Sequence, residues 1–295
     1  MSGLIRTAVF PIAGLGTRFL PVTKSIPKEM LPLIDRPLIQ YAIDEARAAG
    51  ITEFVFVTAR GKGALEDYFD SAPELENELE QRGKRDVLTE LKGVTMPSGA
   101  IASVRQHEAL GLGHAVWCAR GLVGDAPFAV ILPDDVIVGD EPCLKQMVEA
   151  YEAAGEHACM LAAMEVPPEQ ISSYGALEVV EESGPLIRAS GLVEKPKPEE
   201  APSYYAVIGR YILSPRVMDD LGRMKRGAGG EIQLTDAIAD QARAGHPVFG
   251  YRFRGVRYDC GSKLGFLQAT VAFALERDDL RGNFSDYLKE VARNL

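Results

Sequence analysis

The sequence of 295 residues is poor in the residues that build disulfide frameworks, zinc sites and nucleophile-based active sites. Its four histidines have no zinc-binding spacing, and no Ser/His/Asp or Cys/His constellation is recognisable. In a chain of this length, cysteines without a C-x-x-C pair favour reduced thiols, which predicts a cytoplasmic protein. The four cysteines are Cys118, Cys143, Cys159 and Cys260.

The sequence also lacks a long apolar run and an excess of positive charge. No apolar stretch approaches the roughly 20 residues that span a bilayer, and residues 9–12 are too few for a signal-peptide core. The formal net charge is −10 and the pI is near 5.1, with no basic stripe. We therefore expect no membrane and no nucleic-acid partner. An acidic chain can still bind anionic substrates where its cations converge in one cleft.

Apolar residues, in contrast, are present in sufficient number, 46%, to bury a large core. The first half alternates apolar strands with helical patterns, and its predicted strands cover residues 7–12, 54–58, 101–106 and 128–132. The second half predicts strands at 158–166, 176–181, 187–194 and 204–213, and helices at 214–225, 231–244, 262–276 and 284–295. The acidic stretch 73–90 predicts a solvated helical insert.

This alternation predicts an α/β fold. We expect a Rossmann-like, mixed, mostly parallel sheet with helices on both faces and a smaller antiparallel lobe in the second half. No low-complexity linker separates the two halves, so residues 1–295 are expected to form a single domain, with a boundary between halves near residue 150.

A glycine loop, Gly14-Leu15-Gly16-Thr17-Arg18, follows the first strand, and Lys28 comes ten residues after Arg18. Backbone N–H groups in such a loop can approach an anion, while Arg18 and Lys28 add a guanidinium fork and a point charge. The dinucleotide fingerprint G-x-G-x-x-G/A fails at Phe19, and the P-loop pattern is absent. The pattern suits a nucleoside triphosphate, although a glycine pair by itself fits a tight turn equally well.

Four segments together identify a family. They are Ala13–Arg18 with Pro27-Lys28, Val193–Pro196, Gly230–Asp236 and Asp259–Gly265. In these segments the chain resembles the sugar-1-phosphate nucleotidylyltransferases over nearly its whole length, and its N-terminal motif is most similar to the bacterial uridylyltransferases that use UTP and glucose 1-phosphate. Leu15 stands where many members carry another glycine. The resemblance makes 1–150 the nucleotide-binding half and 151–295 the sugar-binding and C-terminal half, with the antiparallel lobe on the sugar side.

Two carboxylate positions are candidates for a metal site. Asp134 and Asp135 directly follow a buried apolar run, and Asp259 precedes a predicted helix. Carboxylates at the end of a central strand lie where open α/β sheets bind ligands, and Mg²⁺ combines one or two carboxylates with phosphate oxygens. A turn at Asp134 and a helix cap at Asp259 explain the same residues without a metal. The resemblance implies that Asp134, by its position after the strand, and Asp259 bind Mg²⁺ as the cofactor.

The resemblance also assigns the sugar side. Glu194 and Lys195 end a predicted strand, where a charged pair is often only a solvated edge. In the family, the lysine contacts the sugar phosphate and the glutamate binds sugar hydroxyls. The Tyr174-Gly175 loop resembles the sugar pocket, with Gly175 giving backbone contacts.

The base-binding residues follow in the same way. A glutamine offers a donor and an acceptor, as reading a pyrimidine edge requires, although a glutamine at a strand end often lies on the surface. The resemblance implies that Gln106 and the Gly111 backbone contact the base, with the remaining nucleotide contacts coming from Ala13, Gly14 and Gly16.

The reaction implied is UTP plus glucose 1-phosphate giving UDP-glucose and pyrophosphate. A phosphate monoester is mostly a dianion at pH 7, so in-line attack on the α-phosphate needs no general base. Lys195 would hold the attacking phosphate, while Arg18 and Lys28 would stabilise the leaving pyrophosphate. The alternatives are a thymidylyltransferase using dTTP and a non-catalytic nucleotide-sugar sensor. The family is commonly dimeric or tetrameric, so a homodimer or homotetramer is expected.

Overall fold

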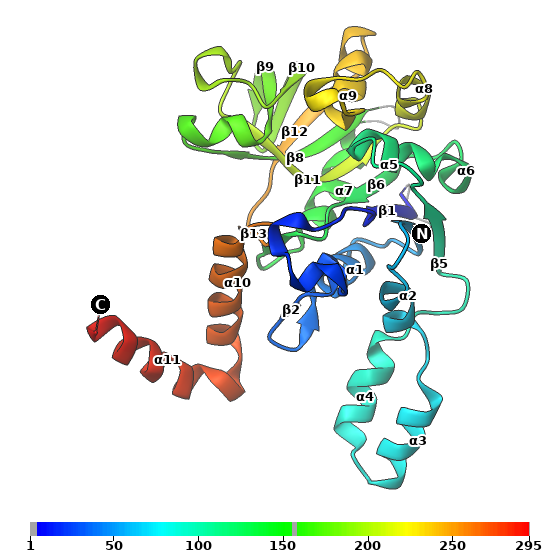
Figure 1. Ribbon diagram of the computed structural model, residues 1–295. Coiled ribbons are helices and arrows are strands. Elements are labelled where there is room, and N and C mark those ends of the chain that lie inside the picture. Colours follow the sequence, from blue (N-terminus) through cyan, green and yellow to red (C-terminus); the bar gives the residue numbers. More distant parts are fainter. Residues whose placement is uncertain (1–4, 155–157, 295) are drawn as a thin grey trace.

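The protein is described by a computed structural model that covers residues 5–154 and 158–294. A nine-stranded sheet in the order β5-β4-β1-β6-β11-β8-β12-β10-β9 runs through both halves of the chain (Figure 1). Its first-half strands are β1 (Thr7–Pro11), β4 (Glu53–Thr58), β5 (Ile101–Arg105) and β6 (Phe128–Ile131). Its second-half strands are β8 (Cys159–Glu165), β9 (Gly175–Ser183), β10 (Leu186–Glu194), β11 (Tyr205–Leu213) and β12 (Val248–Arg252).

The sheet is mixed, and the expected fold class is confirmed. Parallel pairing joins β5, β4, β1 and β6, and it joins β8 to β12. β11 is antiparallel to both β6 and β8, and β9 and β10 form an antiparallel hairpin at the far edge. Antiparallel pairing therefore takes a larger share than expected from the sequence.

Two short antiparallel sheets lie apart from the main sheet. β7 (Asp135–Val138) pairs with β13 (Val256–Asp259), and β2 (Pro32–Leu33) pairs with β3 (Arg36–Pro37). In the first of these, Asp259 is the register partner of Asp135. The strands β7, β12 and β13 were not among those predicted, and the pairing of β7 with β13 brings two acidic turns of distant sequence together.

Helices cover both faces of the main sheet because its strands alternate their side chains. Val9 and Val55 pack in one core, with α5 (Leu112–Cys118), α8 (Val217–Gly222) and α9 (Leu234–Arg243). Their strand neighbours Phe10 and Phe56 pack in the opposite core, with α1 (Leu38–Ala48), α2 (Ala64–Phe69) and α7 (Cys143–Ala154). The short helix α6 (Arg120–Val123) follows α5.

Two helical extensions project from this body (Figure 1). The acidic insert is a pair of helices, α3 (Pro73–Gln81) and α4 (Arg85–Val94), separated at Gly83, whose φ of 68° is left-handed. The C-terminal arm consists of α10 (Lys263–Glu276) and α11 (Asp278–Arg293), so the last helix begins earlier than predicted. Across 5–154 and 158–294, no helix combines the length and the apolar character needed to cross a bilayer.

Candidate active site

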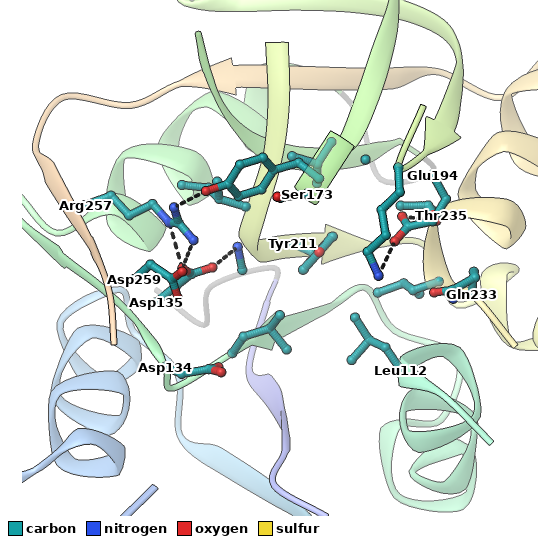
Figure 2. A pocket seen from close by; sticks show the side chains of 18 of the residues that line it. Leu112, Asp134, Asp135, Ser173, Glu194, Tyr211, Gln233, Thr235, Arg257 and Asp259 are labelled. Atoms are coloured by element: carbon teal, nitrogen blue, oxygen red, sulfur yellow. Dashed lines mark hydrogen bonds and ion pairs between the residues drawn. The ribbon is translucent and has the colours of Figure 1, made fainter. Parts of the chain in front are cut away.

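A cavity of about 430 Å³ opens at the carboxyl end of β6. Figure 2 shows Asp134, Asp135, Asp259 and Arg257 at one end of it, and Glu194, Gln233 and Thr235 at the other. This is the edge at which open α/β sheets bind ligands. The predicted site residues that line the cavity are Arg18, Asp134, Gly175, Glu194, Lys195 and Asp259.

Asp134 lies against Lys28. The Lys28 Nζ donates to Asp134 Oδ2 at 2.5 Å, and both side chains are about three-quarters shielded from solvent. Burial alone would raise the pKa of Asp134, but Lys28 and Arg18 outweigh it and lower that pKa. Burial has the opposite sign for the lysine, and here Asp134 and Glu29 outweigh it and raise the pKa of Lys28. The pair is therefore charged on both sides at neutral pH.

Asp259 and Asp134 converge around Gly261. A Cβ atom at Gly261 would lie 2.9 Å from Asp134 Oδ2, 3.1 Å from Asp259 Oδ1 and 3.3 Å from Arg18 Nη1. The Gly261 N–H donates to Asp259 Oδ1 at 3.1 Å, and Arg18 Nη1 donates to the Gly261 carbonyl at 3.3 Å. A glycine is needed here because a side chain would fill the space between the two carboxylates.

The helix-cap alternative for Asp259 is wrong. The N-cap of α10 is Ser262, whose Oγ accepts from the Gly265 N–H at 3.1 Å. The side chain of Asp259 accepts from the Gly261 N–H through Oδ1 and lines the cavity.

The two carboxylates suit a hard divalent cation. Within the residues described, no group of three or more histidine, cysteine, aspartate or glutamate side chains could hold a metal by itself. Two converging carboxylates with a phosphate-sized cavity beside them match the preference of Mg²⁺ for one or two carboxylates plus substrate oxygens. Such a cation would compete with Lys28 for Asp134 Oδ2.

Asp135 has a different environment from its neighbour. Its Oδ1 accepts from Arg257 Nε at 2.7 Å, and its Oδ2 accepts from the Gly209 N–H at 2.8 Å. Burial raises the pKa of Asp135, against the opposing effect of Arg257. Both carboxylate oxygens are engaged, which favours Asp134 as the ligand-binding member of the pair.

Arg257 is a cavity residue that the sequence analysis missed. Besides its contact with Asp135, the guanidinium donates from Nη1 to the Tyr174 hydroxyl oxygen at 2.9 Å. A signal for it was available, because residues two apart on a strand face the same side and Arg257 stands two residues before Asp259. Tyr211 and Thr235 are further lining residues that were not predicted.

The sugar side is built where β9 and β10 meet. Glu194 is the register partner of Gly175, and a Cβ at Gly175 would lie 2.9 Å from Thr235 Cγ2 and 3.4 Å from Glu194 Oε2. Glu194 Oε2 accepts from Thr235 Oγ1 at 2.9 Å. Lys195 Nζ lies 3.5 Å from Glu194 Oε1, and its side chain is 53% exposed. The left-handed φ of 46° at Lys195 is uncommon for a residue with a Cβ, and its N–H donates to the Tyr174 carbonyl at 2.9 Å.

The predicted base-binding residues lie beside the cavity lining rather than in it. Gln106 Nε2 donates to the Gly111 carbonyl at 3.1 Å and lies 3.1 Å from His114 Nδ1. Gly111 has a φ of 108°, and a Cβ there would lie 2.9 Å from the Ile232 carbonyl oxygen, so only glycine fits. These contacts fix the loop that leads into α5.

The glycine loop lies over Lys28. A Cβ at Gly14 would come within 3.8 Å of Lys28 Cε, and one at Gly16 within 3.1 Å of Lys28 Cβ. Gly16 has a φ of 64°, and its carbonyl accepts from Thr23 Oγ1 at 2.8 Å. Ala13 connects this loop to the end of β1. The structure thus joins the glycine loop, Lys28 and Asp134 into one continuous region.

The family model described as nucleotidyl transferase matches residues 9–275. The chain belongs to the nucleotidyl transferase family. Among relatives of this nucleotidyl transferase, the UTP–glucose-1-phosphate uridylyltransferase of Komagataeibacter xylinus is 51% identical over 261 residues, 88% of this chain and 90% of that protein. The uridylyltransferase of the same name from Bacillus subtilis strain 168 is 44% identical over 285 residues, 97% of this chain and 96% of that protein. The resemblance drawn from the sequence is confirmed.

Solved structures are similar to this nucleotidyl transferase along most of its length. A UDP-glucose pyrophosphorylase complexed with UDP-glucose is 42% identical, with a TM-score of 0.82 and coverage of 92% of this chain and 100% of that chain. A UTP-bound UGPase from Acinetobacter baumannii is 42% identical, with a TM-score of 0.88 and coverage of 97% and 99%.

Proposed function

We propose that this nucleotidyl transferase converts UTP and glucose 1-phosphate into UDP-glucose and pyrophosphate. The observation that carries the proposal is the cavity, in which cations and carboxylates from four separate parts of the chain meet: Arg18, Asp134, Glu194-Lys195, and Arg257 with Asp259. The thymidylyl alternative is not favoured, because relatives at 44–51% identity over most of the chain are named for UTP.

The chemistry requires two polyanions to approach each other. The attacking phosphate monoester is mostly a dianion at pH 7, so positioning and charge neutralisation replace a general base. We assign Lys195 to the attacking phosphate because it is the half-exposed cation at the sugar end of the cavity. Arg18 and Lys28, at the opposite end, are assigned to the pyrophosphate that leaves.

The binding contacts are assigned by their places in the fold. Glu194 and the Gly175 backbone would bind sugar hydroxyls where β9 and β10 meet. The base would lie by Gln106 and Gly111, which are tied together by a hydrogen bond at the start of α5. The triphosphate would then extend along the glycine loop, with contacts from Ala13, Gly14 and Gly16.

Mg²⁺ is the proposed cofactor, and Asp134 and Asp259 would hold it. Bound there, it would supply positive charge that neutralises the reacting phosphates. The residues themselves contribute the oxygen donors and, through Arg18 and Gly261, the spacing of the two carboxylates.

A non-catalytic nucleotide-sugar sensor is the alternative from another class. A sensor has no need of cations for a leaving group, so the combined presence of Arg18, Lys28 and Lys195 beside two carboxylates argues against it.

The assembly is proposed to be a homodimer or homotetramer. In support, the projecting arm of α10 and α11 exposes large apolar side chains, with 62% of Leu267 and 59% of Tyr287 accessible. Light scattering coupled to gel filtration would show two or four copies, and a monomer at micromolar concentration would contradict this part of the proposal. The proposal of a single domain rests on the sheet that runs through both halves.

Pyrophosphate release tests the function directly. The purified chain is incubated with Mg²⁺, glucose 1-phosphate and each of UTP, dTTP, ATP, CTP and GTP in turn. Release with UTP well above the others is expected. Dominance of dTTP would keep the reaction and change the base, and silence with every nucleotide from folded protein would leave the sensor.

A further inference from the structure

Arg257 is a buried cation of the cavity to which the proposed chemistry assigns nothing. It lies on β13 two residues before Asp259, and its side chain is only 10% exposed. Burial alone would lower the pKa of Arg257, but Asp135 and Tyr174 outweigh it and raise that pKa. The guanidinium therefore stays charged, and its role follows from what it contacts.

The guanidinium of Arg257 joins two elements that are far apart in sequence. On one side its Nε donates to Asp135 Oδ1 at 2.7 Å, and Nη2 forms a second contact with the same oxygen. On the other side Nη1 donates to the Tyr174 hydroxyl at 2.9 Å, and the guanidinium carbon lies 5.2 Å from the centre of that ring. A planar fork of donors fits this double contact, and a lysine ammonium does not.

Each partner of Arg257 is fastened to a different end of the cavity. Asp135 is the chain neighbour of Asp134, and its backbone carbonyl accepts from Arg210 Nη2 at 2.7 Å. Tyr174 precedes Gly175, and its carbonyl accepts from the Lys195 N–H at 2.9 Å. We call Arg257, Asp135 and Tyr174 together the Arg257 clamp.

We propose that Arg257 is a positioning residue that fixes the sugar-binding loop relative to the turn that carries Asp134. Through the clamp, the two segments that bear Gly175 and Lys195, which the Tyr174 carbonyl and the Lys195 N–H join, keep their separation from Asp134 and Asp259. The proposal rests on the proposed function, since it concerns alignment of the attacking phosphate. Small displacements of reacting groups cost large factors in rate, so such a clamp has a measurable kinetic effect.

The surface of the same protein carries a matched control. Arg252 on β12 lies 3.1 Å from Glu182 Oε2, donates to the Tyr205 hydroxyl at 3.3 Å and has its guanidinium carbon 5.9 Å from that ring. This trio has the same three residue classes as the clamp, but its arginine side chain is 42% exposed and it does not line the cavity. Its loss should leave the reaction unchanged.

The experiment compares Arg257→Lys and Tyr174→Phe with Arg252→Lys and Tyr205→Phe. Steady-state kinetics are measured with glucose 1-phosphate varied at saturating UTP, and UTP affinity is measured by calorimetry. For Tyr174→Phe, the loss of one hydrogen bond should reduce kcat/KM for glucose 1-phosphate roughly fivefold. Arg257→Lys should reduce it by roughly tenfold or more, because both contacts are disturbed. UTP affinity should stay within about twofold in both, as the clamp does not touch the glycine loop.

The combination of Arg257→Lys with Tyr174→Phe tests whether the clamp acts as one unit. If it does, this double variant should be no slower than Arg257→Lys alone. A purely structural role predicts that UTP affinity and kcat/KM for glucose 1-phosphate fall by the same factor. That result would overturn the proposal, as would an unchanged kcat/KM or an equal loss of kcat/KM in Arg252→Lys and Tyr205→Phe.

The controls separate the possible failures. Thermal unfolding is followed for each variant, and Tyr174→Phe, which removes a single oxygen, decides the question if Arg257→Lys does not fold. Wild-type protein that releases no pyrophosphate with any nucleotide overturns the proposed function, and the clamp falls with it. Active wild-type protein with unaffected Tyr174→Phe and Arg257→Lys variants overturns the clamp alone.

Discussion

The two ends of the cavity hold their lysines in different ways. At the glycine-loop end, Lys28 is paired with Asp134 at 2.5 Å. The next residue, Glu29, is paired at 2.7 Å with Lys62, whose side chain is 9% exposed. At the sugar end, Lys195 is 53% exposed and lies 3.5 Å from Glu194. The first end is built from buried charge pairs, and the second leaves its cation open to a ligand.

This difference suggests how each end meets its anion. A phosphate that reaches Lys195 meets a half-exposed ammonium 3.5 Å from Glu194. One that reaches Lys28 must take the lysine from Asp134 at 2.5 Å, a carboxylate that a divalent cation can occupy instead. The backbone of Lys195 is held to the Tyr174 carbonyl, and its side chain forms a half-exposed ion pair with Glu194. Substitution in the buried pair Lys62–Glu29 should therefore affect folding first, whereas substitution of the open Lys195 should affect catalysis.

The largest effect on folding is expected from Lys62→Met. Glu29 is 1% exposed, and removal of Lys62 leaves a buried carboxylate without its ion-pair partner, which costs about 3–5 kcal/mol. Urea unfolding monitored by circular dichroism measures the loss. The exposed pair of Lys197 and Glu200 is the control, and Lys197→Met should change stability by no more than about 1 kcal/mol.

A double variant makes this prediction sharper. Lys62→Met combined with Glu29→Leu replaces the buried ion pair with apolar side chains and should recover most of the stability. If the double variant is as unstable as Lys62→Met alone, the pair does more than neutralise a buried charge.

Asp134→Asn is expected to have the next largest effect, and here the loss is catalytic. Asp134→Asn removes one of the two carboxylates proposed to hold Mg²⁺, and loss of one electrostatic group at a reacting centre costs about 2.7–4 kcal/mol in comparable sites, or roughly 10²–10³ in kcat. Pyrophosphate release at saturating Mg²⁺ is the measurement, and Asp140→Asn, an exposed carboxylate beyond β7, is the control. Full activity of Asp134→Asn would move the metal to Asp135, against the engagement of both its oxygens.

Lys195→Ala tests the half-exposed lysine at the sugar end of the cavity. We expect turnover to fall by roughly a hundredfold while UTP binding stays nearly intact, because the lysine faces the sugar end of the cavity. Lys197→Ala, two residues further along and 68% exposed, should behave like wild type. Kinetics of Lys195→Ala equal to those of wild type would remove Lys195 from the mechanism.

The fold and the site differ in how far they could be predicted from the sequence. Alternating apolar runs predicted the α/β class and most of the main sheet, since strand patterns are local. The short strands β7, β12 and β13 were missed because each contains charged residues within its four or five positions, whereas the equally short β6 is a continuous apolar run. β7 and β13 are also the strands that bring Asp134 and Asp259 to one place.

The site was predicted where a motif carries it and missed where only tertiary contacts do. Arg18, Asp134, Glu194, Lys195 and Asp259 do meet in one cavity, although their roles stay predictions. Arg257 was missed because its partners Asp135 and Tyr174 are 122 and 83 residues away. Its spacing of two residues from Asp259 places it on the same strand face, but no local pattern links it to partners at such separations.

The smallest expected effect is a difference in pH dependence between Glu29 and Asp134. Burial raises the pKa of Glu29 above its ordinary 4.5 despite Lys62 and Lys28, so the folded state binds more protons just above that pH. Stability due to Glu29 therefore falls as the pH rises through 4.5 towards the folded pKa. For Asp134, Lys28 outweighs burial and lowers the pKa below its ordinary 3.8, so its contribution is lost as the pH falls below 3.8.

Urea unfolding between about pH 3 and pH 7 separates these two contributions, because their slopes have opposite signs. Glu29→Gln should flatten the decline above pH 4.5 and leave the acid limb unchanged. Asp134→Asn should flatten the limb below pH 3.8 only. If both variants changed the same limb in the same direction, the two neighbouring pairs would titrate as one unit, and the glycine-loop end would contain one four-charge network instead of two separate ion pairs.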